Sequence, residues 1–394
     1  MFSISRFHTL MTQLPRRTFD QAVTDLSADK HRKGFDCWTQ LQAMLFAQLS
    51  GASSLRTVVA GFNAQASHHY HLGARALKRS TLADANAQTD PQVFARTASA
   101  LMQGLHRSLR QEGHELLCLL DSTSLTLKGP GFDHWTFDTR TRNTQGLKLH
   151  VLYTPGNAAP YLTEFSPANL NDIDVARTLP LDPKRRYVFD KGYCDYAWWK
   201  QIDDAGSIFV TRFKRNAALK IERSREVARD APDGILEDQI VCFGHRHNRA
   251  GHHNPYTAPL RRISVQRQGK APLVLATNDL DSPAAAIAEH YRARWGIELF
   301  FKWIKQHLQL KRFLGRSQNA VKNQVLTALI AYLLVLAYQK IHANHLTVWE
   351  CLAMLSTALF QRPHVESARR TARQRQRLRQ EFLDKQHAWT WSLA

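Results

Sequence analysis

One glutamate in the C-terminal half of the chain stands among cations and an aromatic residue at helical spacing. In the segment Tyr291 to Leu308, YRARWGIELFFKWIKQHL, a helix turning about 100° per residue would carry five such side chains on a stripe roughly 80° wide. These are Tyr291, Arg294, Glu298, Lys302 and Lys305. An apolar seam of Ile297, Phe301, Ile304 and Leu308 runs beside the stripe. The pattern predicts a carboxylate fixed on rigid structure at the edge of a core.

Two aspartates follow apolar, strand-like runs. Asp121 comes after Leu116 to Leu120, and Asp190 comes after Tyr187 to Phe189. A carboxylate at the end of a buried strand is costly to desolvate unless it meets a cation, so two of them indicate a shared partner. Together with Glu298 they would make an all-oxygen metal site suited to Mg²⁺ or Mn²⁺.

Each of these acidic residues also has an ordinary structural interpretation. Glu298 could pair with Lys302, four residues further on, along a solvated helix face. Either aspartate could cap the next helix or turn. Asp172 and Asp174 compete for the second metal position, but their segment looks like a helix start, where acidic residues are favoured anyway.

A three-carboxylate site would suit phosphodiester chemistry. Cleavage needs a water activated near neutral pH and a stabilised leaving alkoxide, and two divalent ions roughly 3.5 to 4 Å apart can serve both ends of an in-line displacement. We expect Asp121, Asp190 and Glu298 to be the catalytic residues and to hold two Mg²⁺ ions, for which Mn²⁺ substitutes. A water would attack phosphorus, without a covalent protein intermediate.

Five residues around Glu298 are candidate DNA contacts. Arg294 and Lys305 would bind phosphates near the cut, Lys302 lies on the same stripe, and Tyr291 would position the same strand. Trp295 could stack on an unpaired base, but packing in the core explains an indole there equally well.

The elements that must position these residues change type along the chain. Helical apolar spacing comes first, and strand-like runs begin near Glu115. The predicted division is a helical N-terminal DNA-binding domain (1–113), an α/β catalytic core in two parts (114–213 and 273–345), a β-rich insertion between them (214–272) and a basic helical tail (346–394). A long helix is expected from near Ser282 past Gln309, and a buried helix at Val325 to Tyr338.

The N-terminal region could read DNA. Residues 53–62 and the basic run 78–81 could form a helix-turn-helix in which Ser80 or Thr81 caps a helix. An ordinary helical bundle with a basic face is an equal alternative.

The bulk composition restricts partners and compartment. The 53 Lys and Arg against 33 Asp and Glu give a net charge of +20, which indicates a polyanionic partner, most readily nucleic acid. Five scattered cysteines without a C-x-x-C pair predict free thiols. The N-terminus lacks a signal-peptide core, and the apolar run 325–338 is shorter than the ~20 residues that a bilayer requires. We expect a cytoplasmic protein without a membrane span.

Three motifs resemble one known family. The runs LLDSTSL (Leu119 to Leu125) and YVFDKGY (Tyr187 to Tyr193) resemble the two aspartate motifs of the IS-four group of bacterial insertion-sequence transposases. The spacing Tyr291-x2-Arg294-x3-Glu298-x6-Lys305 resembles the Tyr-Arg-Glu-Lys signature of that group. The N-terminal stretches WTQLQAMLFAQLSG and RSTLADAN are similar as well, so the resemblance extends over most of the chain.

The resemblance implies an RNase H-like mixed-sheet core, with the two aspartates on adjacent strands, the glutamate on a later helix and an insertion before that helix. It implies a DDE transposase that cuts an element out at its terminal inverted repeats and joins it to target DNA. It also implies that a homodimer brings the two double-stranded DNA ends together in a synaptic complex.

Two other functions remain open: a basic DNA-binding protein without cleavage activity, and an RNase H-like nuclease that does not join strands. Other chemistries are less favoured. The cluster of His245, His247, His252 and His253 lacks the paired spacing of zinc ligands. Ser122 to Ser124 lack the Gly-x-Ser-x-Gly turn of a hydrolase and would instead orient Asp121, and the sequence has no P-loop.

Overall fold

The structure is a computed structural model. It describes residues 5–107, 116–227, 234–244, 254–308, 310 and 312–362. These residues form two compact units: unit 1 covers 5–107, 127–138 and 300–362, and unit 2 covers 116–126 and 139–299. The histidine cluster and most of the predicted tail lie outside the described residues. Asp121, Asp190 and Glu298 all belong to unit 2.

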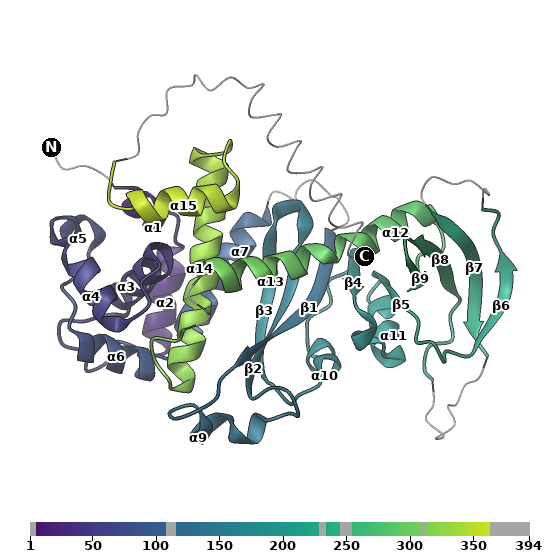
Figure 1. Ribbon diagram of the computed structural model, residues 1–394, viewed down its shortest axis with the longest axis horizontal. Coiled ribbons are helices and arrows are strands. Elements are labelled where there is room, and N and C mark those ends of the chain that lie inside the picture. Colours follow the sequence, from purple (N-terminus) through teal and green to yellow (C-terminus); the bar gives the residue numbers. More distant parts are fainter. Residues whose placement is uncertain are drawn as a thin grey trace. The chain divides into compact units, whose positions relative to one another are not determined.

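Unit 1 is helical in its described part. Its N-terminal helices are α1 (Arg6–Met11), α2 (Arg16–Asp25), α3 (Cys37–Ser50), α4 (Leu55–Asn63), α5 (Ala66–Leu72), α6 (Arg79–Gln88) and α7 (Gln92–Leu105). The short α9 (Asp133–Thr136), the long α14 (Gln318–His342) and α15 (Val348–Ala358) follow later in the chain (Figure 1). Because α14 packs against α3, α6, α7 and α15, it forms the centre of this unit.

The central helix α14 confirms the buried helix predicted at 325–338 and extends it at both ends. Nearly every side chain from Ala320 to Tyr338 is buried. By length and composition alone this 25-residue helix could cross a membrane, but 89% of its apolar window is buried inside the protein. This extent of burial is typical of a helix in the core of a protein.

Helix α6 begins differently from the prediction. Its first residue is Arg79, preceded by the extended residue Lys78, which makes no side-chain cap hydrogen bond. The prediction that Ser80 or Thr81 caps this helix is therefore wrong, because the chain has already turned into the helix before either residue. In the same region, α4 does begin with a side-chain cap, a capping box between Ser54 and Thr57.

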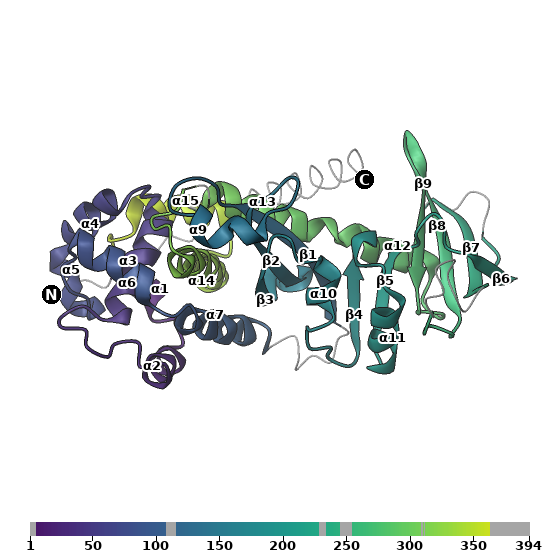
Figure 2. The same cartoon turned by 90° about the horizontal axis from the view of Figure 1, so that it is seen from below.

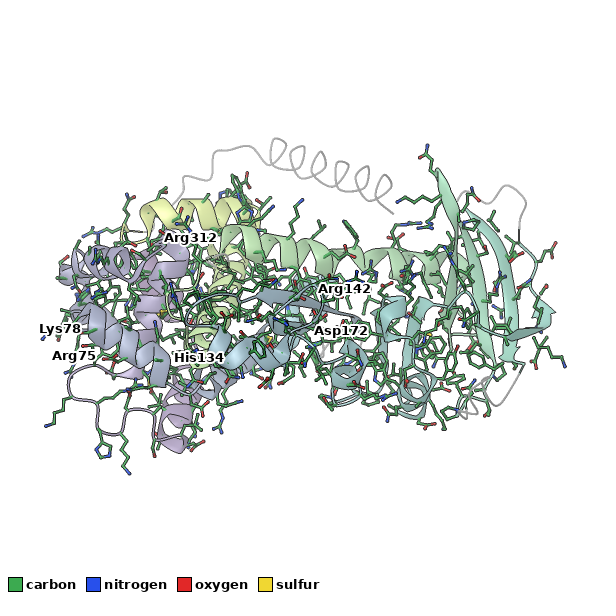
Figure 3. The ribbon with its side chains drawn as sticks, turned by 60° about the horizontal axis from the view of Figure 1, so that its bottom comes forward. Arg75, Lys78, His134, Arg142, Asp172 and Arg312 are labelled. Atoms are coloured by element: carbon green, nitrogen blue, oxygen red, sulfur yellow. The ribbon has the colours of Figure 1, made fainter. Side chains whose placement is uncertain are left out.

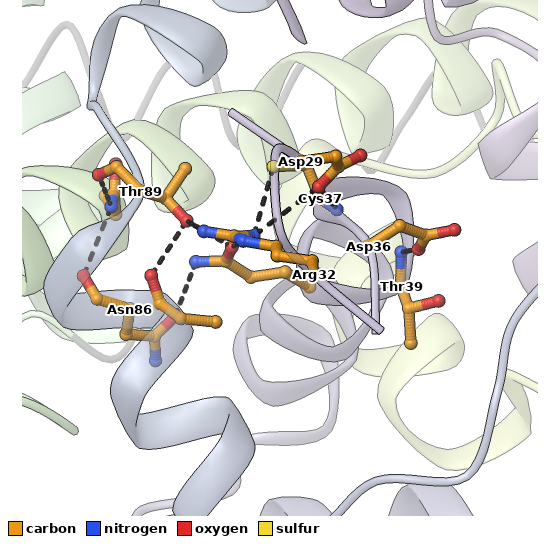
Figure 4. A network of polar contacts seen from close by, with 10 residues as sticks. Asp29, Arg32, Asp36, Cys37, Thr39, Asn86 and Thr89 are labelled. Carbon is orange, nitrogen blue, oxygen red and sulfur yellow. Dashed lines mark hydrogen bonds and ion pairs between the residues drawn. The ribbon is translucent and has the colours of Figure 1, made fainter. Parts of the chain in front are cut away.

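A buried polar network joins α3, α6 and α14. Gln40 of α3 donates from Nε2 to Asn86 Oδ1 at 2.9 Å and accepts a hydrogen bond from Thr89 Oγ1 at 2.6 Å. Asn323 of α14 donates to the backbone oxygens of Asn86 and Thr89 at 3.3 and 2.9 Å. Arg32 Nη2 donates to Thr89 Oγ1 at 2.8 Å (Figure 4). These hydrogen bonds offset the desolvation of buried amides and fix the three helices against one another.

Unit 2 is built on a nine-stranded sheet in its described part. The strands are β1 (Leu116–Thr126), β2 (Gly146–Thr154), β3 (Ala159–Pro167), β4 (Arg185–Phe189), β5 (Ile208–Arg212), β6 (Leu219–Ser224), β7 (Ile235–Phe243), β8 (Leu260–Arg267) and β9 (Lys270–Thr277). Their order across the sheet is β3-β2-β1-β4-β5-β9-β8-β7-β6. β1 is antiparallel to β2 but parallel to β4, and β4 is parallel to β5. The predicted mixed α/β fold is confirmed at this level.

The helices of unit 2 are α10 (Asp172–Ala176), α11 (Tyr196–Asp204), α12 (Ala284–Ala293) and the first part of α13 (Trp295–His307), with single 3-10 turns at Pro155–Asn157 and Lys191–Tyr193. Parallel strands need a crossover connection, and α11 supplies it between β4 and β5. It buries Trp198 against Phe189 and Trp199 against Phe209, with ring centroids 4.6 and 4.8 Å apart. This aromatic core supports the strand that ends at Asp190.

The β-rich segment predicted at 214–272 contains β6, β7, β8 and the beginning of β9 (Figure 2). β9 runs on to Thr277 and pairs with both β8 and β5. The run 273–278, which the sequence assigned to the second part of the core, is therefore the strand that joins the insertion to the rest of the sheet.

Two buried ion pairs lie where the insertion meets the rest of unit 2. Arg186 of β4 donates from Nη1 to Asp279 Oδ2 at 2.6 Å, and both side chains are almost fully buried. Arg261 of β8 makes a bidentate pair with Asp238 of β7, at 2.7 and 2.6 Å. Arg261 also donates to the backbone oxygen of Ser282, just before α12. These contacts fix the start of the helical segment that carries Glu298.

Candidate active site

Strand pairing brings the two predicted aspartates together. In the parallel pair of β1 and β4, Leu120 lies opposite Phe189. The next residue on each strand is an aspartate, so Asp121 and Asp190 emerge side by side from the sheet. Asp190 directly follows β4, as predicted, but Asp121 does not end β1, because the residues after it continue to pair with β2 as far as Thr126.

The glutamate is brought to the same place by α13. The start of this helix lies against β1 and β2, where a Cβ added at Gly296 would lie 3.6 Å from Leu119 and 3.8 Å from Tyr153. The predicted long helix is interrupted at Arg294, where α12 has ended and α13 has not begun. Tyr291 therefore lies in the last turn of α12, Arg294 lies at the junction of the two helices, and Glu298 lies in the first turn of α13.

Two arginines form ion pairs with the three carboxylates. Arg294 Nη2 donates to Glu298 Oε1 at 2.6 Å, and its Nη1 lies 3.8 Å from Asp121 Oδ2. Arg212, the last residue of β5, forms an ion pair with Asp190. Tyr291 makes a long hydrogen bond, 3.5 Å, from its hydroxyl to Asp190 Oδ1. Three negative and two positive groups therefore form one cluster at the ends of β4 and β5.

The surroundings of the two aspartates shift their pKa values in opposite directions. The pKa of Asp121 is raised to about 6, chiefly by burial; the Ser122 N–H and Arg294 oppose this rise, and the charges of Glu298 and Asp190 add to it. Burial also raises the pKa of Asp190, but the hydrogen bond and charge of Arg212, with smaller contributions from Lys191 and Arg294, bring it below its usual value. The negative charge of Asp190 is thus well compensated by its neighbours, while that of Asp121 is not.

Neutralising Asp121 should stabilise the metal-free protein. The folded state holds a proton on Asp121 up to a pH of about 6, against 3.8 for an ordinary aspartate, so ionisation costs folding free energy as the pH rises through that window. Metal-free Asp121→Asn should therefore melt about 2 °C above wild type at pH 7.5, and this difference should vanish below pH 4. Thermal unfolding across that pH range measures it. A lower melting temperature for the variant at pH 7.5 would mean that Arg294 fully compensates the charge.

The chemistry of the donor set fits a divalent cation. Three carboxylates supply hard oxygen ligands, and two arginines leave one negative charge of the cluster uncompensated. In the described part of the chain, however, no three His, Cys, Asp or Glu side chains converge as a metal site. The described carboxylates pair with arginines instead: Arg294 contacts Asp121 and Glu298, and Arg212 contacts Asp190.

The other predicted contacts are placed differently. Trp295 is half-buried at the start of α13. Lys302 and Lys305 follow on the same helix in unit 1, where Lys302 is exposed and burial lowers the pKa of Lys305. Asp172 pairs with Lys148 at 2.9 Å at the start of α10, which accounts for it without a metal (Figure 3).

The sequence interpretation missed Arg212. The feature of the sequence that could have indicated Arg212 is the strand-like run SIFVTRF, because this run forms the strand next to β4. Had the parallel pairing of β4 and β5 been foreseen, the arginine closing β5 would have been expected at the same edge of the sheet. Ser122 was expected to orient Asp121, and its backbone N–H does donate to Asp121 Oδ1 at 2.8 Å.

A sheet edge that gathers three carboxylates with arginines is typical of enzymes that act on phosphate esters. The family model described as "Transposase DDE domain" matches residues 112–334, more than half of the chain. The chain belongs to the DDE transposase family, whose members cleave DNA and transfer strands. Residues 3–75 match a second model, described as a domain of unknown function (DUF4372).

Relatives agree with this family. A protein of Sinorhizobium fredii named as a transposase, y4zB, is 38% identical over 73% of this chain and 79% of its own length. A protein of Geobacillus stearothermophilus named as a transposase for insertion sequence element IS5377 is 26% identical over 56% of this chain and 55% of its own. The match to a Synechocystis protein named for element IS4SA is 27% identical over 38% and 39%. The predicted resemblance to insertion-sequence transposases is confirmed.

A solved structure, the cryo-EM synaptic complex of the piggyBac transposase with hairpin DNA, is similar over 93% of this chain and 81% of that chain. Its TM-score is 0.44 and its sequence identity is 11%. A likeness of this size does not establish a common fold.

Proposed function

We propose that this protein is the transposase of a bacterial insertion sequence and moves its element by cutting and pasting. It would cleave DNA at the terminal inverted repeats and join the freed 3′ ends to target DNA. The observation that carries the proposal is the cluster of Asp121, Asp190 and Glu298 with two arginines, within the region that matches the DDE transposase family.

The core of unit 2 is proposed to be RNase H-like. Its five strands β3-β2-β1-β4-β5 combine an antiparallel meander with two parallel strands, and an insertion separates β5 from the helices α12 and α13. The N-terminal helices would form a DNA-binding domain, since Arg75 and Lys78 (Figure 3) and Arg79 are exposed there and the chain has a net charge of +20. The predicted domain boundaries remain part of this proposal.

Asp121, Asp190 and Glu298 would hold two divalent ions, Mg²⁺ in the cell with Mn²⁺ as a substitute. When bound, the ions would supply an activated nucleophile and stabilise the leaving oxygen. The protein's own groups prepare the site. Arg212 and the Tyr291 hydroxyl hold Asp190 in place, and the Ser122 N–H orients Asp121.

DNA contacts are proposed on both sides of Glu298. A guanidinium binds phosphate oxygens through two parallel hydrogen bonds, which suits Arg294 to a phosphate near the cut. Lys302 and Lys305 would bind phosphates further along the strand, and Trp295 would stack on an unpaired base. A homodimer would hold the two element ends in one synaptic complex, in the cytoplasm and bound to the nucleoid.

The test uses the full chain, a DNA fragment carrying both flanks of its gene, and a target plasmid. With Mg²⁺ or Mn²⁺ we expect cuts at the borders of matching inverted repeats and joined products in the plasmid, and neither without metal. Asp172→Asn, a change of charge in the same unit but outside the cluster, should behave as wild type. Cleavage without joining would identify a nuclease, and binding without cleavage would identify a DNA-binding protein.

A further inference from the structure

Arg294 is held by two of the three carboxylates at once. Its two terminal nitrogens contact Glu298 at 2.6 Å and Asp121 at 3.8 Å. Its side chain is only 16% exposed, and its Nε is buried without a hydrogen bond to any described residue. The guanidinium also lies 5.9 Å from the ring of Tyr291. Arg294 therefore stands inside the cluster, at the atoms that would have to coordinate a metal ion.

This arrangement conflicts with direct metal binding. In the described residues the acidic side chains do not converge as a metal site, and the Arg294 guanidinium contacts both Asp121 and Glu298. A divalent ion that took oxygens from both residues would compete with Arg294 for them, and the two cations would repel each other at close range. Among the described ion pairs Arg212 has Asp190 as its partner, so it does not bridge two of the proposed ligands as Arg294 does.

We propose that Arg294 is an exchangeable counterion: it neutralises Glu298 and Asp121 while the site holds no metal, and it releases them when a divalent ion binds. The released guanidinium is then free for a DNA phosphate, so that metal loading and phosphate binding favour each other. Because such a coupling is reciprocal, DNA bound at the site would also raise the affinity for metal. The proposal rests on the proposed function, in which Asp121 and Glu298 are metal ligands.

The test measures Mn²⁺ affinity of the full chain without DNA, by the electron paramagnetic resonance signal of free Mn²⁺, together with the melting temperature with and without Mn²⁺. Removing the competing cation in Arg294→Gln should tighten Mn²⁺ binding by at least about fivefold, in the usual range of coupling between sites. The metal-free form of this variant should melt at a lower temperature than metal-free wild type. Mn²⁺ should raise the melting temperature of the variant by more than it raises that of wild type. Unchanged or weaker Mn²⁺ binding would overturn the proposal and make Arg294 a support for Glu298.

Two controls make the result specific. Arg292→Gln removes the same charge two residues away, from a pair with Glu289, and should leave Mn²⁺ affinity unchanged. If Arg294→Gln does not fold, Arg294→Lys takes its place, because lysine keeps the charge but cannot bridge two carboxylates. Tighter Mn²⁺ binding than wild type would then support the exchange, and equal or weaker Mn²⁺ binding would refute it. Glu298→Gln tests the underlying assignment, since an affinity equal to wild type would show that Glu298 is not a ligand, whatever Arg294 does.

Discussion

Replacing Glu298 with glutamine will abolish DNA cleavage by this transposase and leave its affinity for DNA almost unchanged. Glutamine keeps the shape of the side chain and an oxygen that can accept the Arg294 hydrogen bond, but it removes the charge that a divalent ion requires. A loss of several kcal/mol of transition-state stabilisation corresponds to a rate at least about 10³-fold lower. Cleavage of a labelled element end measures the rate, and fluorescence anisotropy with the same DNA measures binding.

Glu289→Gln is the matched control for this change. Glu289 lies on α12, is largely exposed and pairs with Arg292, so the same loss of charge occurs one helix earlier without touching the cluster. It should cleave at the wild-type rate. A Glu298→Gln variant that cleaves within tenfold of wild type would remove Glu298 from the catalytic residues.

The largest loss of stability is expected from Asp279→Ala. Asp279 is 4% exposed and pairs with the equally buried Arg186 at 2.6 Å. Its other oxygen accepts hydrogen bonds from the N–H groups of Asp281 and Ser282 before α12. Removing it takes the ion-pair partner away from a buried guanidinium, and breaking a buried pair in this way typically costs about 3–5 kcal/mol. Urea unfolding at pH 7 measures this free energy.

Asp204→Ala provides the comparison. Asp204 pairs with Lys200 at 2.7 Å, a distance similar to that of the buried pair, but both side chains are about half exposed. Water screens such a pair, so the variant should lose less than about 1 kcal/mol. Equal losses for the two variants would show that burial does not set the strength of these ion pairs.

The sequence predicted which elements hold the three carboxylates because the residues next to each carboxylate form a local apolar pattern. The apolar runs before Asp121 and Asp190 are strands, and the pairing of Leu120 with Phe189 places the two aspartates side by side. The seam beside Glu298 packs its helix, since Ile297, Phe301 and Ile304 are buried. Spacing along one chain segment was sufficient to predict the strands and the helix, whereas the adjacency of the two aspartates was implied by the family resemblance.

Charge partners could not be predicted in the same way. Glu298 has a cation four residues away in both directions, Arg294 and Lys302, and helical spacing alone cannot choose between them. The structure pairs it with Arg294, which also reaches Asp121. The contact of Arg212 with Asp190 joins residues on two strands, and it depends on which strands are neighbours. Such partners follow from the sheet order, which periodicity along the chain does not contain.

The pairing of β5 with β9 has a consequence for attempts to obtain a smaller enzyme. β5 ends in Arg212 and is hydrogen-bonded on one side by β4 and on the other by the last strand of the insertion. A shortened chain without that strand would leave a row of unpaired backbone N–H and C=O groups next to the carboxylates, open to pairing with another molecule. The insertion therefore covers an edge that would otherwise favour aggregation, and a soluble minimal version would need a substitute strand in its place.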